Sequence, residues 1–332
     1  MQAKGGMAVT TVNRVLAALI EADGAVSGEW LARKLGVTRN AVWKAIARLR
    51  EEGYQIEAAT NRGYRLVSGG EPVSEAGIRA WLKAQSLGHE IEVHERIGST
   101  NSRAKALAAQ GAPHGLLVCA REQTGGRGRF GRAFYSPAGS GVYLSLLLRP
   151  KLPAERAVLL TSMTAVAVAR AIERLADVEV RIKWVNDLFI GDRKVCGILC
   201  EAGMDFESGQ LEYAVAGIGV NTARAAFPPE LAQIATSVGN ACGRDISNNR
   251  LIAEICNEME GLYGSLADGS FMAENRARSN VIGRRIWILR GGAREPAEAL
   301  DIDEQGGLVV RTGAGVETLR SGEVSIRLEE ER

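Results

Sequence analysis

Apolar positions near the start of the chain recur at helical spacing in three short segments. The second segment follows Ser27, a residue type that caps helices, and ends at Gly36. The third follows Thr38 and ends at Gly53. Beyond it, residues 55–59 and 64–67 have strand character and flank a turn, Asn61-Arg62-Gly63. The apolar stripe of the first segment consists of Val12, Val15, Leu16, Leu19 and Ile20.

This order, three helices and then a β-hairpin, predicts a winged helix-turn-helix domain over residues 1–67. The third helix would bury Val42, Ile46 and Leu49 and turn a polar, basic face outward. Residues 1–66 carry a net charge of +4, whereas the rest carries −2. A basic amino-terminal domain of this kind favours binding to nucleic acid. The alternatives to DNA binding are that the outer face of this helix is merely solvated, or that the module binds protein. For Trp43 alone, the alternative is packing under the wing. The predicted DNA-binding residues are Thr38, Arg39, Asn40, Trp43, Lys44 and Arg62.

After a linker at 68–72, helical and strand-like patterns alternate, and this predicts an α/β domain over residues 74–270. From about residue 283 the pattern changes to short strands with Gly-rich turns, which predicts a small β-barrel over 280–330. The expected helices are 74–87, 100–110, 154–176 and 248–267; the expected strands are 116–120, 142–148 and 213–218, then 285–289, 297–302, 308–311 and 323–328.

Composition indicates an ordinary globular protein, with 46% hydrophobic and 24% charged residues among 332. No early signal-like segment and no apolar run of membrane-spanning length occurs, so we expect a cytoplasmic protein with no membrane partner. The five cysteines are scattered and match no zinc spacing, which favours reduced thiols over a metal site.

The segment from Gln123 to Arg132, QTGGRGRFGR, has four glycines and three arginines in ten residues. It suits neither a helix nor a packed strand. Backbone amides and guanidinium groups instead suit a loop that closes around an anion such as phosphate. It is not a Walker loop, because the chain has no Gly-Lys dipeptide. By itself such a loop could equally bind RNA or be disordered.

A second constellation lies at Lys183-Trp-Val-Asn-Asp187, where a strand runs into a polar pair. A hairpin follows, with Lys194 at its mouth. The chain has only eight lysines against thirty-three arginines, so Lys194 does not reflect a general abundance of lysine. A single lysine in a hairpin is nevertheless usually solvated, and only the surrounding motifs indicate whether Lys194 has a chemical role.

Taken together, the motifs resemble those of the bifunctional bacterial biotin–protein ligase/repressors, in order and spacing and over nearly the whole chain. Val185 departs from the family, which commonly has proline there. The resemblance implies an α+β protein: a winged helix-turn-helix, a catalytic domain with a mixed sheet, and an SH3-like β-barrel. The motifs are Ser99-Thr-Asn101, Gly126–Arg132, Lys183–Asp187, Arg193-Lys194 and the Gly217-Ile-Gly-Val-Asn221 run.

The resemblance further implies a two-step reaction. Biotin attacks ATP, with Mg²⁺ present, to form biotinoyl-5'-AMP, and a lysine of a biotin carboxyl carrier protein then takes the biotin. The adenylate would also act as co-repressor, promoting a homodimer that binds operator DNA. The rival interpretations are a lipoate–protein ligase and a biotin-sensing repressor without catalysis.

The same resemblance assigns roles to residues. Lys194 would bridge the biotin carboxylate and the phosphate, while Arg127, Arg129 and Arg132 would hold the loop over the adenylate. Asp187 is a candidate base. The ligands of the metal are left open. The full expected binding set is Ser99, Thr100, Asn101, Gln123, Gly126, Arg127, Gly128, Arg129, Arg132, Asn186, Lys194, Gly217, Gly219 and Asn221, with Lys194, Arg127, Arg129 and Asp187 as the catalytic residues.

Overall fold

The computed structural model describes residues 10–22, 24–59, 63–67, 71–205, 207–290, 293–320 and 325–328. The chain divides into two compact units. One comprises residues 1–83 with 245–254, and the other comprises residues 84–244 with 255–332. Each unit is described by itself below.

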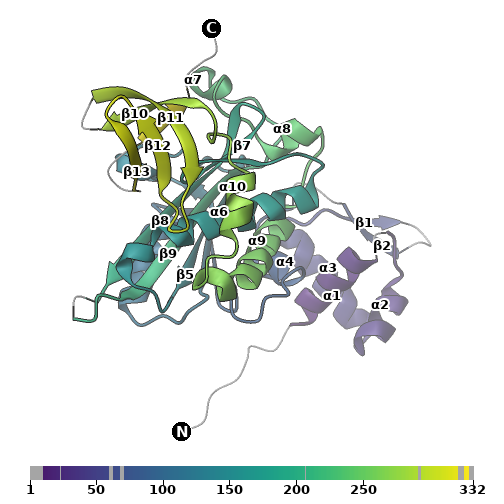
Figure 1. Cartoon of the computed structure of the whole chain (residues 1–332). Helices are drawn as coiled ribbons and strands as arrows, with labels where there is room; N and C mark the ends of the chain where they lie inside the picture. The colour runs from purple at the N-terminus through teal and green to yellow at the C-terminus, as the bar shows by residue number, and fades with distance from the viewer. Residues whose placement is uncertain are drawn as a thin grey trace. The chain divides into compact units, whose positions relative to one another are not determined.

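The first unit contains the predicted three helices and hairpin (Figure 1). The side chains of Thr10, Ser27 and Thr38 cap the three helices, and Gly36 ends the second in a left-handed conformation. Tyr64 and Val26 exchange backbone hydrogen bonds, which adds a bridge to the hairpin. The elements are α1 (Thr11–Glu21), α2 (Gly28–Leu35), α3 (Arg39–Glu51), β1 (Ile56–Ala59), β2 (Gly63–Leu66) and α4 (Glu75–Arg79).

The helix expected over 74–87 is wrong beyond Arg79, where α4 ends. Residues 84–87 bond instead to side chains of a later helix, α9 (Asn248–Tyr263). Ala84 N–H donates to Asn257, and the next three N–H groups donate to the Glu260 carboxylate. These acceptors replace the helical carbonyls, so the amphipathic pattern does not continue as a helix.

Glu260 makes stability depend on pH. Burial acts to raise its pKa, but hydrogen bonds from the N–H groups of Gln85, Leu87 and Ser86 and from the Ser86 hydroxyl prevail and lower it to about 2. The carboxylate therefore stabilises the fold above its ordinary pKa of 4.5, and this contribution is lost as the pH falls toward 2. We expect Glu260→Gln to lower the free energy of unfolding at pH 7. The deficit should shrink between pH 4.5 and 2 in urea titrations, and a deficit independent of pH would contradict this origin.

The second unit is built on a seven-stranded mixed sheet in the order β3-β4-β5-β9-β8-β7-β6, in which only β3 and β4 are parallel neighbours. It confirms the expected catalytic fold class. The strands are β3 (Ile91–Ile97), β4 (Leu117–Gln123), β5 (Gly141–Leu148), β6 (Arg181–Lys183), β7 (Asp187–Ile190), β8 (Arg193–Met204) and β9 (Leu211–Asn221).

Helices pack against this sheet (Figure 1). Ala104 and Ala108 of α5 (Thr100–Ala109) lie against Val118, Leu147 and Val215 of the strands. Most side chains of α6 (Val158–Leu175) are buried, and this helix begins after a separate 3₁₀ turn, η2 (Ala154–Arg156), so the expected helix 154–176 is divided. The expected helix 248–267 likewise ends in a 3₁₀ turn, η3 (Gly264–Leu266), after α9. The remaining helices are α7 (Pro229–Ala232), α8 (Val238–Cys242) and α10 (Met272–Ala277).

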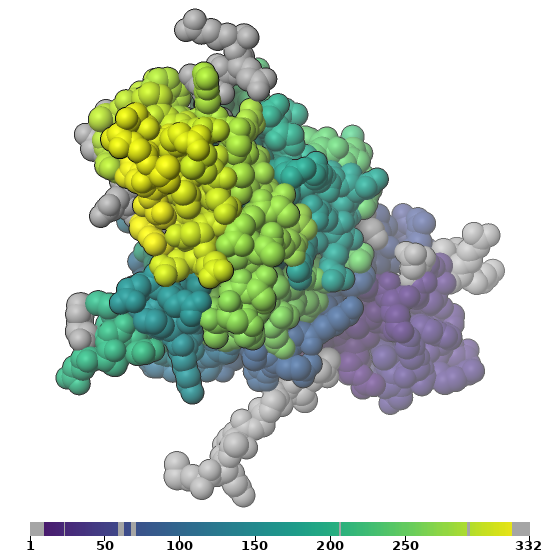
Figure 2. Space-filling model, in the orientation of Figure 1, coloured from purple at the N-terminus to yellow at the C-terminus, as the bar shows by residue number. Residues whose placement is uncertain are grey.

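A five-stranded antiparallel sheet ends the chain, in the order β13-β12-β11-β10-β14. Figure 2 shows the segment from β10 to β13 at the surface in yellow-green and yellow. The sequence analysis missed β13, whose residues are mostly exposed apart from Leu319. The indole Nε1 of the buried Trp184 donates to Gly306 O at 3.0 Å, so the β11–β12 turn contacts the end of β6. The strands are β10 (Arg285–Arg290), β11 (Ala293–Ile302), β12 (Leu308–Thr312), β13 (Gly315–Leu319) and β14 (Ser325–Leu328).

The five cysteines are not joined by disulfide bonds in the structure. Burial raises the pKa of the Cys200 thiol to about 11 and that of Cys256 to about 12, so neither is a thiolate at neutral pH. Among the described residues, no helix has both the length and the apolar character needed to cross a membrane.

Candidate active site

Lys194 lies at the start of β8, and its Nζ is 2.7 Å from Oδ1 of Asp187 on β7. Both side chains are about one-third exposed. The backbone of Lys194 is fixed on its other side, because its N–H donates to Ile234 O and its carbonyl accepts from Thr236 N–H. The hairpin thus holds a cation and a carboxylate at a partly exposed position. The sequence predicted Lys194 at its mouth but not the pairing with Asp187.

Asn186 connects this pair to the Gly/Arg loop. Its Nδ2 donates to Ile198 O at 2.9 Å, which leaves its Oδ1 to accept a bond from Nη1 of Arg129 at 3.4 Å. The pKa of Arg129 lies below its ordinary value, mainly because the side chain is buried. The charge of Asp187 acts to raise this pKa, and the charge of Arg132 acts to lower it. Arg129, Asn186, Asp187 and Lys194 therefore form one cluster, which we call the charged cluster.

The Gly/Arg loop is a compact turn between β4 and β5. Gly128 N–H donates to Arg132 O at 2.7 Å, and Phe134 N–H donates to Gly126 O at 3.0 Å. Gly131 has a φ of 70°, a left-handed conformation that glycine adopts without strain. The side chains of Arg127 and Arg132 are exposed, so only Arg129 of the three loop arginines is drawn into the charged cluster.

A network of neutral hydrogen bonds forms the second part of the site. Thr100 N–H and its hydroxyl both contact Gln123 Oε1, at 2.9 and 3.1 Å. Asn101 donates through Nδ2 to Leu199 O and to Glu201 Oε2, so its Oδ1 must be the acceptor for the Ser145 hydroxyl at 2.6 Å. Glu201 is paired in turn with Lys105. The amide of Asn101 is therefore held in one orientation.

Gly217 and Gly219 on β9 allow two side chains to approach the sheet closely. A Cβ at Gly217 would lie 2.0 Å from Asn101 Oδ1, and one at Gly219 would lie 2.4 Å from the Phe134 ring. The same ring lies 6.0 Å from Lys194 Nζ and would be 3.0 Å from a Cβ at Gly197. We call the part of β9 at Gly217 and Gly219 the glycine surface. Phe134 thus connects the glycine surface with the charged cluster.

Three residues of this site were missed by the sequence analysis: Phe134, Ser145 and Glu201. Phe134 lies two residues after Arg132, the last residue of the Gly/Arg loop. Ser145 is the one serine or threonine in the fully buried run GVYLSLLL, between Tyr143-Leu144 and Leu146–Leu148. A polar residue in a buried strand was the signal available for Ser145. Nothing in the local pattern marks Glu201 before its partners are known.

Two predicted residues have structural partners. Asn221 Nδ2 donates to Thr236 O at 3.1 Å and braces the segment that pairs with Lys194. Ser99 caps α5 by accepting from Ser102 N–H at 3.4 Å. Among the described residues, no group of three or more His, Cys, Asp or Glu side chains is arranged to hold a metal ion.

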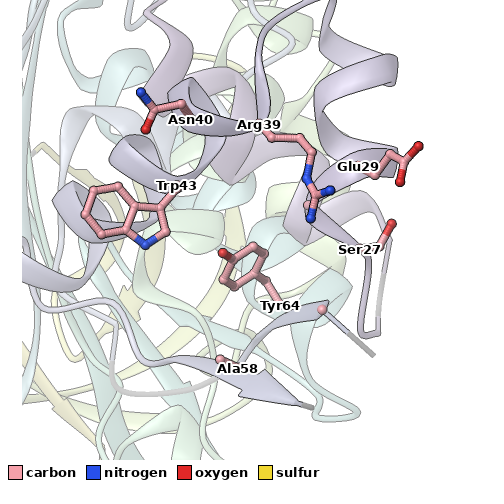
Figure 3. Close-up of a pocket in the computed structure, with 9 residues that line it drawn as sticks. Ser27, Glu29, Arg39, Asn40, Trp43, Ala58 and Tyr64 are labelled. Atoms are coloured by element: carbon pink, nitrogen blue, oxygen red, sulfur yellow. The ribbon is translucent and has the colours of Figure 1, made fainter. Parts of the chain in front are cut away.

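The outer face of α3 forms a second site, in the other unit. Arg39, Asn40, Trp43 and Lys44 are exposed there, while Val42, Ile46 and Leu49 are buried as predicted. Thr38 uses its side chain to cap the helix at Ala41 N–H. Arg62 lies outside the described residues. A hollow of about 590 Å³ lies between α3, the start of α2 and the hairpin (Figure 3).

Three family models match the chain in the predicted order. Residues 11–65 match the HTH domain, residues 93–221 the biotin/lipoate A/B protein ligase family, and residues 281–327 the biotin protein ligase C terminal domain. The bifunctional ligase/repressor BirA of Bacillus subtilis is 37% identical, over 91% of this chain and 94% of the relative. The chain belongs to the BirA family of bifunctional ligase/repressors.

Membership of the BirA family confirms the resemblance inferred from the motifs. The biotin–[acetyl-CoA-carboxylase] ligase of Mycobacterium tuberculosis is 31% identical over 76% of this chain and 95% of that relative. A solved biotin protein ligase from Aquifex aeolicus, in complex with biotin and ATP, has a TM-score of 0.63, with 24% identity over 72% of this chain and 99% of the other. At 24% identity, this structural likeness shows a shared fold over 72% of this chain.

Proposed function

We propose that this chain activates biotin with ATP to biotinoyl-5'-AMP, transfers biotin to a lysine of a biotin carboxyl carrier protein, and represses transcription when liganded. The observation that carries the proposal is the charged cluster. It places Lys194 beside Asp187 and Arg129, and Phe134 links it to the glycine surface of β9. Family membership supports the same activity.

The first step must bring two anions together. A carboxylate and a phosphate about 4 Å apart repel by about 4 kcal/mol at an effective dielectric of 20. Lys194, whose backbone is fixed by hydrogen bonds to Ile234 and Thr236, supplies in its Nζ the cation between the carboxylate and the phosphate. The carboxylate oxygen forms a bond to the α-phosphorus, and the bond to pyrophosphate breaks. Arg129 adds a second positive charge from the loop and helps to exclude water.

The biotin end of the site is neutral and partly apolar. Gly217 and Gly219 leave room for Asn101 and the Phe134 ring against β9, so these two side chains line the proposed biotin surface and the ring offers an apolar wall. Thr100 and Gln123 present hydrogen-bonding groups that suit the ureido ring. Ser99, Asn101, Gly126, Gly128 and Asn221 complete the proposed binding set, and Arg127 and Arg132 would close the loop over the adenylate.

Mg²⁺ would enter with ATP, because magnesium in such sites is held by substrate phosphates, waters and one or two carboxylates. Asp187 is the carboxylate of the charged cluster and fits that requirement, with Asn186 Oδ1 as the neighbouring oxygen. The metal would neutralise phosphate charge. Asp187 would exchange its partner Lys194 for the ion, or take up a proton from the incoming lysine.

Pyrophosphate release from ATP tests the proposed chemistry, with biotin, lipoate or no acid added. Release with biotin alone, followed by labelling of a biotin carboxyl carrier domain, is the expected result. Release with lipoate would identify a lipoate–protein ligase. Tight biotin binding without pyrophosphate release would identify a sensor without catalysis.

Asn40→Ala separates the DNA-binding activity from the ligase activity. The Asn40 amide is exposed on α3, so its removal is expected to cost about 1–3 kcal/mol of operator affinity, roughly 5- to 150-fold. Fluorescence anisotropy with labelled operator measures the loss, and pyrophosphate release should be unchanged. An unaltered operator affinity would show that α3 does not contact the bases.

Three further parts of the proposal rest on the sequence. The functional domains are 1–67, 74–270 and 280–330, the liganded chain forms a homodimer on a two-fold operator, and the protein is cytoplasmic. Sedimentation velocity tests the homodimer: biotin with ATP should raise the mass from one chain to two, and an unchanged mass would refute it.

A further inference from the structure

Trp43 is exposed to an unusual degree for its size. The indole is 60% exposed on α3, whereas its neighbour Val42 is 0% exposed. Trp43 follows Arg39 by four residues and Asn40 by three, so the three side chains share one helical face. Exposed aromatic surface of this size is costly in water, and its burial in a complex would be favourable.

The hollow beside Trp43 is shaped by both aromatic and polar groups. Figure 3 shows the Trp43 indole, the Tyr64 ring and the Arg39 side chain turned toward the same space, with Asn40 at its edge. Tyr64 is held there by the backbone bonds between β2 and Val26. The hollow therefore combines an apolar wall with hydrogen-bonding groups at its rim.

We propose that Trp43 contacts the 5-methyl group of a thymine in the major groove, and that Asn40 contacts the adenine of the same or the adjacent A·T pair. This inference rests on the proposed DNA-binding function. Among the base edges of the major groove, the thymine methyl is the apolar group, and adenine N6 and N7 match an asparagine amide. An indole with one N–H and no charge has little to offer a phosphate.

The spacing along α3 agrees with this assignment. Three residues of an α-helix advance by about 4.5 Å, which is close to the rise of about 3.4 Å between base pairs. Asn40 and Trp43 can thus contact the same or successive base pairs when the helix lies along the groove. Trp43 then determines specificity for thymine, beyond strengthening the binding.

Replacing thymine by uracil removes only the methyl group and tests the contact directly. The probe is a duplex selected from a random-sequence pool by the protein in the presence of biotin and ATP. Each thymine of the selected duplex is replaced by uracil in turn. With wild-type protein, we expect uracil to weaken binding about fourfold at one position in each half of a two-fold site. This is the change that corresponds to one buried methyl group.

Variants then assign that loss to Trp43. Trp43→Ala should bind the thymine and uracil duplexes equally, and Trp43→Phe should retain part of the difference. Lys44→Ala, the matched control on the same face, should weaken binding to both duplexes by the same factor, as a phosphate contact does. Melting curves and pyrophosphate release of each variant should equal those of the wild type, since Trp43 is not part of the buried core.

The outcomes separate this inference from the function on which it rests. Failure to select any sequence would refute the proposed DNA binding. Selection of a sequence whose affinity is indifferent to uracil at every position would overturn the thymine contact while leaving DNA binding intact. So would a Trp43→Ala protein that still distinguishes thymine from uracil. The uracil scan uses the unaltered chain, so its result does not depend on how any variant folds.

Discussion

Replacing Lys194 with alanine is expected to slow biotin-dependent pyrophosphate release by about 10²–10³-fold, roughly 3–4 kcal/mol of transition-state stabilisation, as does removal of an oxyanion donor from other enzymes. The physical reason is that two anions must meet, and Lys194 supplies the cation nearest to Asp187. Removal of the ammonium leaves the carboxylate of Asp187 to add to the repulsion. Pre-steady-state measurement of pyrophosphate release gives the rate of adenylate formation itself.

The matched control is Lys151→Ala, which removes an exposed lysine of the same unit and should leave the rate unchanged. Lys194→Arg keeps the charge but changes its shape, and should recover only part of the rate because a guanidinium fork cannot occupy the position of a compact ammonium. Near-normal adenylate formation by Lys194→Ala would eliminate the bridging role.

Replacing Gly217 with alanine is expected to lower kcat/KM for biotin by about 100-fold, the cost typical of a 1 Å displacement at a catalytic site. The new Cβ would lie 2.0 Å from Asn101 Oδ1, and contacts under 3.0 Å do not occur. Asn101 cannot rotate away cheaply, because its amide is bonded to Leu199, Glu201 and Ser145. The overpacking should also reduce the free energy of unfolding by about 1–3 kcal/mol.

Gly261→Ala provides the comparison, since no atom lies within 4 Å of a Cβ at that position in α9. Alanine there should preserve kcat/KM and raise stability by about 0.5–1 kcal/mol, the helix preference of alanine over glycine. Equal kinetics for Gly217→Ala and the wild type would mean that biotin does not bind near Asn101. A loss of stability without a change in KM would give Gly217 a packing role only.

Local chemistry explains which parts of the fold could be predicted. Ser27, Gly36 and Thr38 fix helix ends through their own side chains or backbone, so the elements of the first unit were predictable. The segment 84–87 was not, because its amides are satisfied by Asn257 and Glu260, about 175 residues away in the sequence. Strand β13 escaped detection because it buries little apolar surface.

The candidate site shows the same division. Lys194 and Asp187 share a hairpin, and a hairpin keeps its members together whatever the rest of the fold does. Phe134, in contrast, acquires its importance only from Gly197 and Gly219 on two other strands, and Glu201 only from Asn101 and Lys105. Sequence patterns identify residues with evident chemistry, whereas residues defined by distant partners require coordinates.

The bond from Trp184 to Gly306 bears on how this architecture can evolve. A descendant that lost the C-terminal sheet would expose the indole of Trp184, whose N–H now donates to Gly306 O, to water, two residues from Asn186. Exposing a large apolar side chain costs about 1.5–3 kcal/mol, a large share of a typical stability. Loss of the sheet therefore favours a second substitution at position 184. A lineage that carries tryptophan here is under pressure to inherit both parts together.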